Sequence, residues 1–75
     1  MTLSEIKQAI ESGHNVHWHH EGYDVIKGKY EYLICYKHNQ SCIGLTHRDN
    51  ITLNGKESDF FISKNQIFLY LKETI

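Results

Sequence analysis

The chain has 75 residues, of which 40% are hydrophobic and 23% charged, a balance that is ordinary for a globular domain and excludes an intrinsically disordered chain. Its eight lysines and arginines and nine aspartates and glutamates are interspersed without a run of one sign, which excludes the basic surface typical of a double-stranded DNA binder. We therefore expect one globular domain spanning 1–75, with a core too thin for a deep, enclosed active site.

The N-terminal segment predicts a helix. Thr2 and Glu5 stand at capping-box spacing, in which the threonine hydroxyl accepts from a free backbone amide and the glutamate reaches back to the cap. Gly13 supplies the left-handed residue that ends many helices. The residues between them form one apolar stripe at helical spacing: Leu3, Ile6, Ala9 and Ile10.

After Gly13 the apolar pattern changes to a period of two, which is typical of strands. The predicted strands are 15–19, 23–27, 30–37 and 41–46, with turns at 20–22, 27–29 and 38–40, a polar loop at 47–50, a short edge strand at 51–53 and a turn at 54–55. The C-terminal part predicts a hairpin of 60–63 and 67–71, although 63–73 also fits a helix. The expected fold is α+β, an N-terminal helix packed on a curved antiparallel meander.

The segment 14–20 holds four of the six histidines and the only tryptophan. In a strand, Val16 and Trp18 would face the core and His17 and His19 the opposite side. Such an H-x-H pair can chelate a metal, but no third or fourth ligand stands at a diagnostic spacing. We therefore predict no metal and no cofactor, and interpret the two imidazoles as an exposed polar face.

The tyrosines Tyr30, Tyr32 and Tyr36 share one face of the third predicted strand and have lysines nearby. Such a stripe is used to bind single-stranded nucleic acid, but it also fits a hydrophobic core. Ile34 between the rings and the neutral charge balance favour the core, and we do not expect nucleic acid as a partner. A tyrosine at the rim of the sheet, such as Tyr36, would suit protein recognition.

Catalytic candidates are few. Cys35 or Cys42 could be a nucleophile with His47 as base, or His47 could pair with Asp49, yet nothing nearby would activate a thiol or form an oxyanion hole. The two cysteines lack C-x-x-C spacing and fit two free, mostly buried thiols. We therefore predict no enzymatic activity, and interpret the loop that contains Arg48 as an exposed contact.

The N-terminal residues have neither the basic nor the apolar region of a signal peptide, and no apolar run approaches the roughly 20 residues that span a bilayer. The sequence therefore predicts a cytoplasmic protein without a membrane partner.

Several short motifs follow the segment Ile6–Gly13: Val16-x-Trp18, Gly22-Tyr23-x-Val25-Ile26, Cys42-Ile43-Gly44-Leu45-Thr46 and Thr52-Leu53-Asn54-Gly55. In this arrangement the chain resembles short uncharacterised proteins of phages and other mobile elements. The resemblance implies an inhibitor that binds a host protein or protein complex, as anti-CRISPR proteins do. It assigns no activity to individual residues.

These observations predict a small, non-enzymatic binding protein, monomeric or homodimeric. The alternatives are a single-stranded nucleic-acid-binding module that uses the three tyrosines and a small metal-binding domain that uses the H-x-H pair. The residues predicted to contact a partner are His17, Trp18, His19, Tyr36, His47, Arg48 and Asp49.

Overall fold

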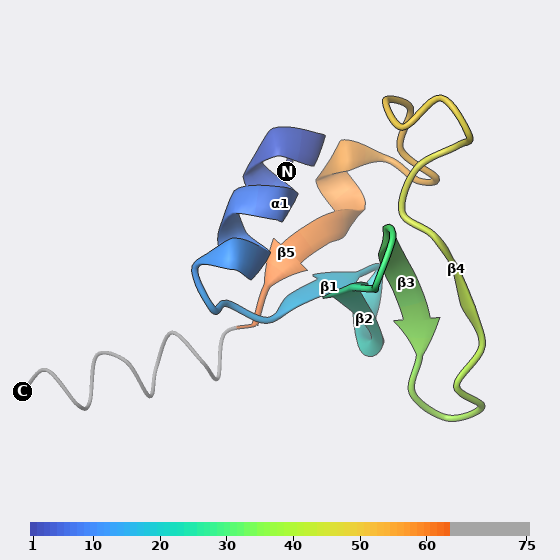
Figure 1. The fold of residues 1–75 in the computed structure, drawn as a ribbon. Coiled ribbons are helices and arrows are strands. Elements are labelled where there is room, and N and C mark those ends of the chain that lie inside the picture. Colours follow the sequence, from blue (N-terminus) through green and yellow to red (C-terminus); the bar gives the residue numbers. More distant parts are fainter. Residues whose placement is uncertain (64–75) are drawn as a thin grey trace, which may run out of the picture.

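The computed structural model describes residues 1–63 and shows one helix against a five-stranded antiparallel sheet (Figure 1). The elements are α1 (Leu3–Glu11), β1 (Val16–Trp18), β2 (His20–Lys27), β3 (Tyr32–Tyr36), β4 (Cys42–Gly44), the short 3₁₀ helix η1 (Glu57–Asp59) and β5 (Phe60–Ile62). The α+β fold with an N-terminal helix is therefore confirmed. The predicted strand at 67–71 and its helical alternative lie outside the described residues.

Helix α1 begins and ends where its local sequence predicts. The Thr2 hydroxyl accepts from the Glu5 backbone amide at 3.2 Å, and the Thr2 amide donates to the Glu5 carboxylate at 2.8 Å. Gly13 has a φ of 90°, a left-handed conformation that costs glycine nothing. The helix buries Ile6 and Ala9 against the sheet.

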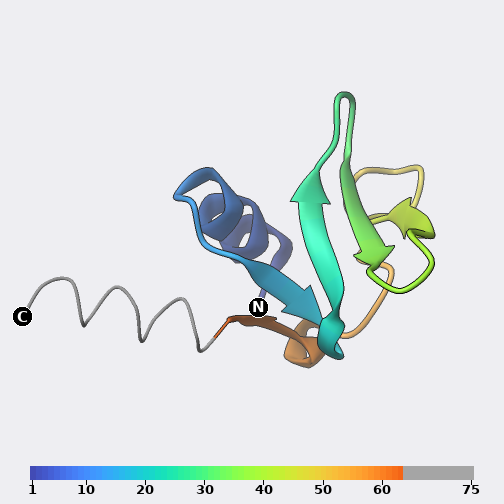
Figure 2. The same ribbon diagram turned by 90° about the horizontal axis from the view of Figure 1, so that it is seen from below.

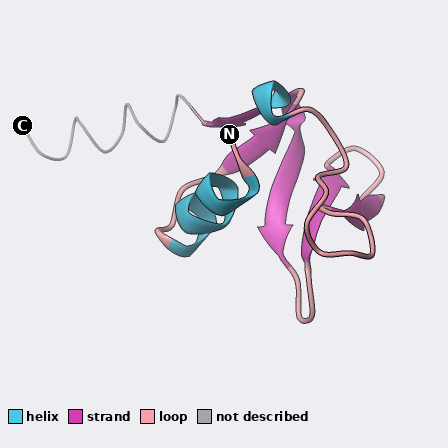
Figure 3. Cartoon of the chain, turned by 90° about the horizontal axis from the view of Figure 1, so that it is seen from above, coloured by secondary structure: helices cyan, strands magenta, loops and turns pink. Residues whose placement is uncertain are grey.

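The strand order is β4-β3-β2-β1-β5, so the first four strands form a meander and β5 returns to pair with β1. Figure 2 shows β2 and β3 as adjacent, oppositely directed strands joined by a narrow turn. Figure 3 separates α1 and η1 from the strands by colour. The predicted edge strand at 51–53 is wrong, because only a single bridge between Thr46 and Leu53 forms there.

The core lies between α1 and one face of the sheet. Strand pairing places Val16 beside Val25, and Val25 beside Ile34, on the face toward the helix. Full burial of such a side chain stabilises a fold by about 1.5–3 kcal/mol. The buried hydrophobic residues are Ile6, Ala9, Val16, Val25, Ile34, Leu45 and Phe60.

The two cysteines form a disulfide between β3 and β4, so the prediction of free, buried thiols is wrong. Cys35 and Cys42 are direct partners in the register of the two strands, and their Cα atoms are 4.1 Å apart. The strand pairing, rather than a short cysteine motif, brings the thiols together. Cys42 is exposed and Cys35 is half-buried.

Candidate functional site

Six aromatic and imidazole side chains are in contact at the end of the sheet where β1 turns into β2. Tyr23 is central: its ring centroid is 5.0 Å from that of Trp18, in an edge-on arrangement, and 4.7 Å from that of Tyr36. The contacts continue from Tyr36 to His38 at 5.1 Å. We call the set the ring cluster: Trp18, His19, His20, Tyr23, Tyr36 and His38.

A tight reversal of the chain brings three consecutive rings to this end. The register between β1 and β2 shifts after His17, so that Trp18 pairs with His20, and His19 between them has a φ of 68°. The His19 amide donates to the Asp59 carbonyl at 2.7 Å, which ties the reversal to η1. The His19 ring lies 5.7 Å from the Trp18 ring and 5.3 Å from the His20 ring.

The cluster combines apolar rings with exposed imidazoles. Trp18, Tyr23 and Tyr36 are half-buried, whereas the three histidines are exposed. Edge-on and offset ring pairs contribute about 0.5–1.5 kcal/mol beyond their buried area. The cluster is therefore a surface with an apolar base and a polar rim.

His20 also serves the backbone. Its Nδ1 accepts a hydrogen bond from the Gly22 amide at 3.0 Å, which requires that this nitrogen carry no proton. A Cβ at Gly22 would lie 2.6 Å from the His20 ring, so the close approach depends on glycine.

Trp18 is held from the other side by the loop before η1. A Cβ at Gly55 would lie 2.5 Å from the indole Nε1, so the Gly55 backbone packs directly on the ring. The indole N–H is buried and has no acceptor within residues 1–63. This contact orients the tryptophan toward Tyr23.

The structure brings together only part of the predicted contact set. Trp18, His19 and Tyr36 are in the ring cluster, but His17 is on the opposite face of the sheet and is only 5% exposed. Its Nδ1 lies 3.1 Å from the Tyr23 carbonyl and 3.1 Å from a carboxylate oxygen of Asp24. The predicted opposition of Val16 and His17 is correct, but the predictions of a solvated His17 and of a face shared by His17 and His19 are wrong, because β1 ends at Trp18 and His19 contacts the Trp18 ring.

His17 is buried because of its neighbours in the sheet. Register places it between Asp24 on β2 and Phe61 on β5, and its ring centroid is 5.5 Å from that of Phe61. Lys37 lies 3.6 Å from Asp24 and places a positive group beside the carboxylate. His17 and His19 therefore point into different surroundings, and no group of three or more metal-ligating side chains is present in the described part of the chain.

The predicted contact residues His47, Arg48 and Asp49 lie in the loop after β4 and have no ring contact with the cluster. Asp49 serves its own turn: its carboxylate accepts from the Thr52 hydroxyl at 2.6 Å and from the Thr52 and Ile51 amides at 2.9 Å. These hydrogen bonds, with that of the Thr52 hydroxyl the largest, lower the pKa of Asp49 from 3.8 to about 2. The carboxylate therefore stabilises its own loop through these hydrogen bonds.

The three tyrosines of the predicted stripe are separated. Tyr30 lies in the turn before β3 and is 89% exposed, and Tyr36 joins the ring cluster. Tyr32 lies at the opposite end of β3, where its hydroxyl donates to Glu11 of α1 at 2.7 Å. The stripe is neither a continuous core nor a continuous platform.

The sequence prediction missed Tyr23, His20 and His38. The available signal was the alternation along β2, which places Tyr23 on the same side as Val25. That signal becomes specific only once the β2–β3 register is known, because the register sets Tyr23 opposite Tyr36. His20 and His38 were assigned to turns, where their neighbours depend on turn geometry.

No protein-family model matches the sequence, and neither a curated protein nor a solved structure matches the chain. Within residues 1–63, no helix combines the length and apolar content required to cross a membrane.

Proposed function

We propose that this protein is a small, non-enzymatic binding protein whose ring cluster contacts a host protein or protein complex. The observation that carries the proposal is the continuous series of ring contacts from His19 through Trp18, Tyr23 and Tyr36 to His38. Tryptophan and tyrosine are enriched among the residues that dominate binding energy at protein interfaces. The cluster offers both on one surface.

The cluster is supported by rigid elements. Tyr23 and Tyr36 are opposite each other on paired strands, and Cys35, directly before Tyr36, is linked by a disulfide to β4. Rings that are ordered before binding lose little conformational freedom in a complex, which favours affinity. The backbone around the rings is therefore a suitable base for recognition.

Two observations support a function without catalysis. The thiols that the sequence offered as nucleophiles are joined in a disulfide and are no longer available for attack. The Asp49 carboxylate, which could have oriented His47 as a base, is bound by Thr52 and Ile51.

The finer identity of the partner rests on the resemblance to proteins of phages and mobile elements. On that basis we propose inhibition of a host defence complex, as anti-CRISPR proteins do. A direct test is expression of the protein in a bacterial strain with an active CRISPR system, where protection of a targeted phage supports the proposal. A panel of CRISPR types in which no targeted phage is protected contradicts the anti-CRISPR proposal and leaves protein binding to its own test.

The binding surface is tested by capture from a host lysate with three immobilised proteins. The wild type and the control Tyr30→Ser are expected to retain the same partner, whereas the double variant Tyr36→Ser/His38→Ser is expected to lose it. Tyr30 is a matched control because it is an exposed tyrosine outside the ring cluster. Equal capture by all three proteins, or capture of no specific partner, contradicts the proposal.

A further inference from the structure

The Cys35–Cys42 disulfide closes the loop that contains two residues of the ring cluster, Tyr36 and His38. Its two sulfur atoms differ in accessibility. Cys35 is half-buried on β3, which has β2 and β4 on its two sides, whereas Cys42 is exposed at the start of the edge strand β4. A thiol in solution can therefore reach the bond from the side of Cys42.

The loop has a specific conformation between the two cysteines. The Tyr36 amide donates to the Ser41 carbonyl at 2.8 Å, and the Tyr36 carbonyl accepts from the Gln40 amide at 2.8 Å. Gln40 has a φ of 58°, a left-handed conformation that a residue with a side chain keeps only where the surrounding structure holds it. The disulfide is a covalent part of that surrounding structure.

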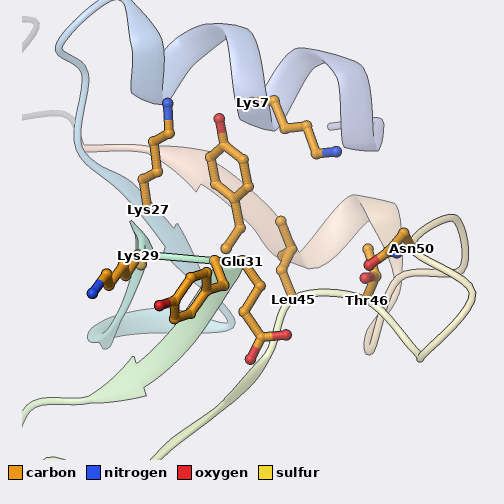
Figure 4. Close-up of a pocket in the computed structure, with 10 residues that line it drawn as sticks. Lys7, Lys27, Lys29, Glu31, Leu45, Thr46 and Asn50 are labelled. Carbon is orange, nitrogen blue, oxygen red and sulfur yellow. The ribbon is translucent and has the colours of Figure 1, made fainter.

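The two ends of β4 are held in different ways. At the Gly44 end, the Gly44 carbonyl accepts from the Asn54 side chain at 2.8 Å, and the next amide, that of Leu45, donates to the Tyr32 carbonyl at 2.9 Å. Leu45 is only 1% exposed and its side chain points toward α1 (Figure 4). At the other end, the disulfide joins Cys42 to β3. Opening the disulfide would release the Cys42 end and leave the Gly44 end anchored.

We propose that this disulfide is a redox switch for the ring cluster. In the oxidised form the loop holds the His38 ring 5.1 Å from the Tyr36 ring. Reduction opens the loop, separates the two rings and weakens binding of the partner. The conformational change depends only on the contacts described above, whereas its effect on binding rests on the proposed function.

The reductant is a dithiol, and the reaction is thiol–disulfide exchange. One thiolate of the reductant attacks Sγ of Cys42 and forms a mixed disulfide, and Cys35 leaves as a thiolate that takes up a proton. The second thiolate of the reductant then attacks the reductant sulfur of the mixed disulfide, and Cys42 leaves and is protonated. Two electrons and two protons pass from the dithiol, which becomes a disulfide, to the protein.

Nuclear magnetic resonance of the full chain, with and without dithiothreitol, tests the conformational change. Reduction is expected to speed amide exchange in 37–42 and to remove the proton contact between the Tyr36 and His38 rings, while β1 and β2 stay protected. The variant Cys35→Ser/Cys42→Ser should show the same opened loop without reductant. An unchanged ring contact overturns the proposal, as does loss of protection throughout β1 and β2, which would be unfolding of the whole domain.

Mass spectrometry after brief treatment with glutathione tests the point of attack. Tryptic cleavage after Lys37 separates the two cysteines, so the position of the mixed disulfide can be read directly. We expect glutathione mainly on Cys42, and glutathione mainly on Cys35 contradicts attack from the edge strand.

Capture from a desalted host lysate tests the effect on binding. Compared with the oxidised wild type, the reduced and alkylated wild type and the double serine variant are each expected to retain about tenfold less partner. Reoxidation of reduced, unalkylated protein should restore capture. Equal capture by the oxidised, reduced and serine forms overturns redox control and leaves the proposed function standing. Capture by none of them contradicts the proposed function, and the resonance comparison then decides the conformational switch.

Discussion

Tyr32 and Tyr36 lie on the same strand and the same face of the sheet, four residues apart, yet they have different surroundings. Tyr32 is beneath α1, where its hydroxyl donates to Glu11, and the Glu11 carboxylate raises the pKa of this phenol. Tyr36 is instead in contact with two other rings, those of Tyr23 and His38. The same residue type is thus structural where the helix covers it and available for recognition where the ring cluster begins.

Ile34, which lies between Tyr32 and Tyr36 on β3, stabilises both ends of the sheet. Ile34 is 2% exposed, whereas Ile43, its direct partner on β4, is 54% exposed. Ile34→Ala should lower the free energy of unfolding by about 2–5 kcal/mol, and Ile34→Val by about 0.5–1.5 kcal/mol. Urea denaturation is the measurement, and both ends should unfold together.

Ile43→Val is the matched control for this effect and should be nearly neutral, because its methyl groups are largely in water. Equal decreases in the free energy of unfolding for Ile34→Val and Ile43→Val would contradict the described position of the core.

The disulfide should matter more for the end with Tyr36 than for the end with Tyr32. It closes a loop with a sequence separation of 7, and its removal should cost about 2–3 kcal/mol by chain entropy. We expect reductant to lower the urea midpoint and to speed amide exchange at Tyr36 more than at Tyr32. The variant Cys35→Ser/Cys42→Ser should start at the lower stability and not respond to reductant.

The contact of Gly55 with Trp18 is specific to the ring cluster. Gly55→Ala places a methyl group against the indole and should cost about 1–3 kcal/mol through overpacking. Because the chain has one tryptophan, its fluorescence reports the displacement directly, and we expect the emission to shift.

Gly13→Ala provides the comparison, since it strains a left-handed residue that has nothing within 4 Å of its added Cβ. It should lower stability and leave the native emission unchanged. An unshifted spectrum for Gly55→Ala would contradict the described packing.

Acid should affect the end of the sheet beneath α1 through Glu11. The lowered pKa of Glu11 means that its contribution to stability is present above its unfolded pKa and is lost as pH falls through the folded value. Tyr32→Phe, which removes one of its hydrogen-bond donors, should reduce that acid dependence slightly, measured as urea midpoints below about pH 5. An unchanged acid profile would show that the hydroxyl does not hold the carboxylate.

Partner binding should depend on the exposed imidazoles of the ring cluster. His19→Gln/His38→Gln should weaken capture of the partner, and His17→Gln is the comparison because His17 is buried away from the cluster.

Local features were predictable from the sequence, and features set by strand register were not. The capping box at Thr2 and the left-handed Gly13 depend on residues within one turn of the helix, so their prediction was correct. The burial of His17 and the disulfide of Cys35 depend on which residue lies opposite on a neighbouring strand. A shift of one residue in the register would move His17 and Cys35 away from these opposite residues.

The candidate site shows the same limit. Trp18, His19 and Tyr36 were identified from residue type, but Tyr23, which joins them, was missed because cross-strand contacts follow from pairing. Asp49 was predicted as a contact, yet it caps its own turn. Residue chemistry alone does not distinguish a carboxylate that holds a loop from one that is free to bind.

The return of β5 to the side of β1 has a consequence for how the chain folds. Strands β1 to β4 each pair with a strand adjacent in the sequence. The second edge of β1 pairs only with β5, where Val16 lies opposite Ile62. Closing so long a loop costs entropy before any new contact compensates, which slows folding relative to the formation of the hairpins. During synthesis, the edge of β1 stays unpaired until 60–62 have left the ribosome, and in that interval it is open to pairing with another chain.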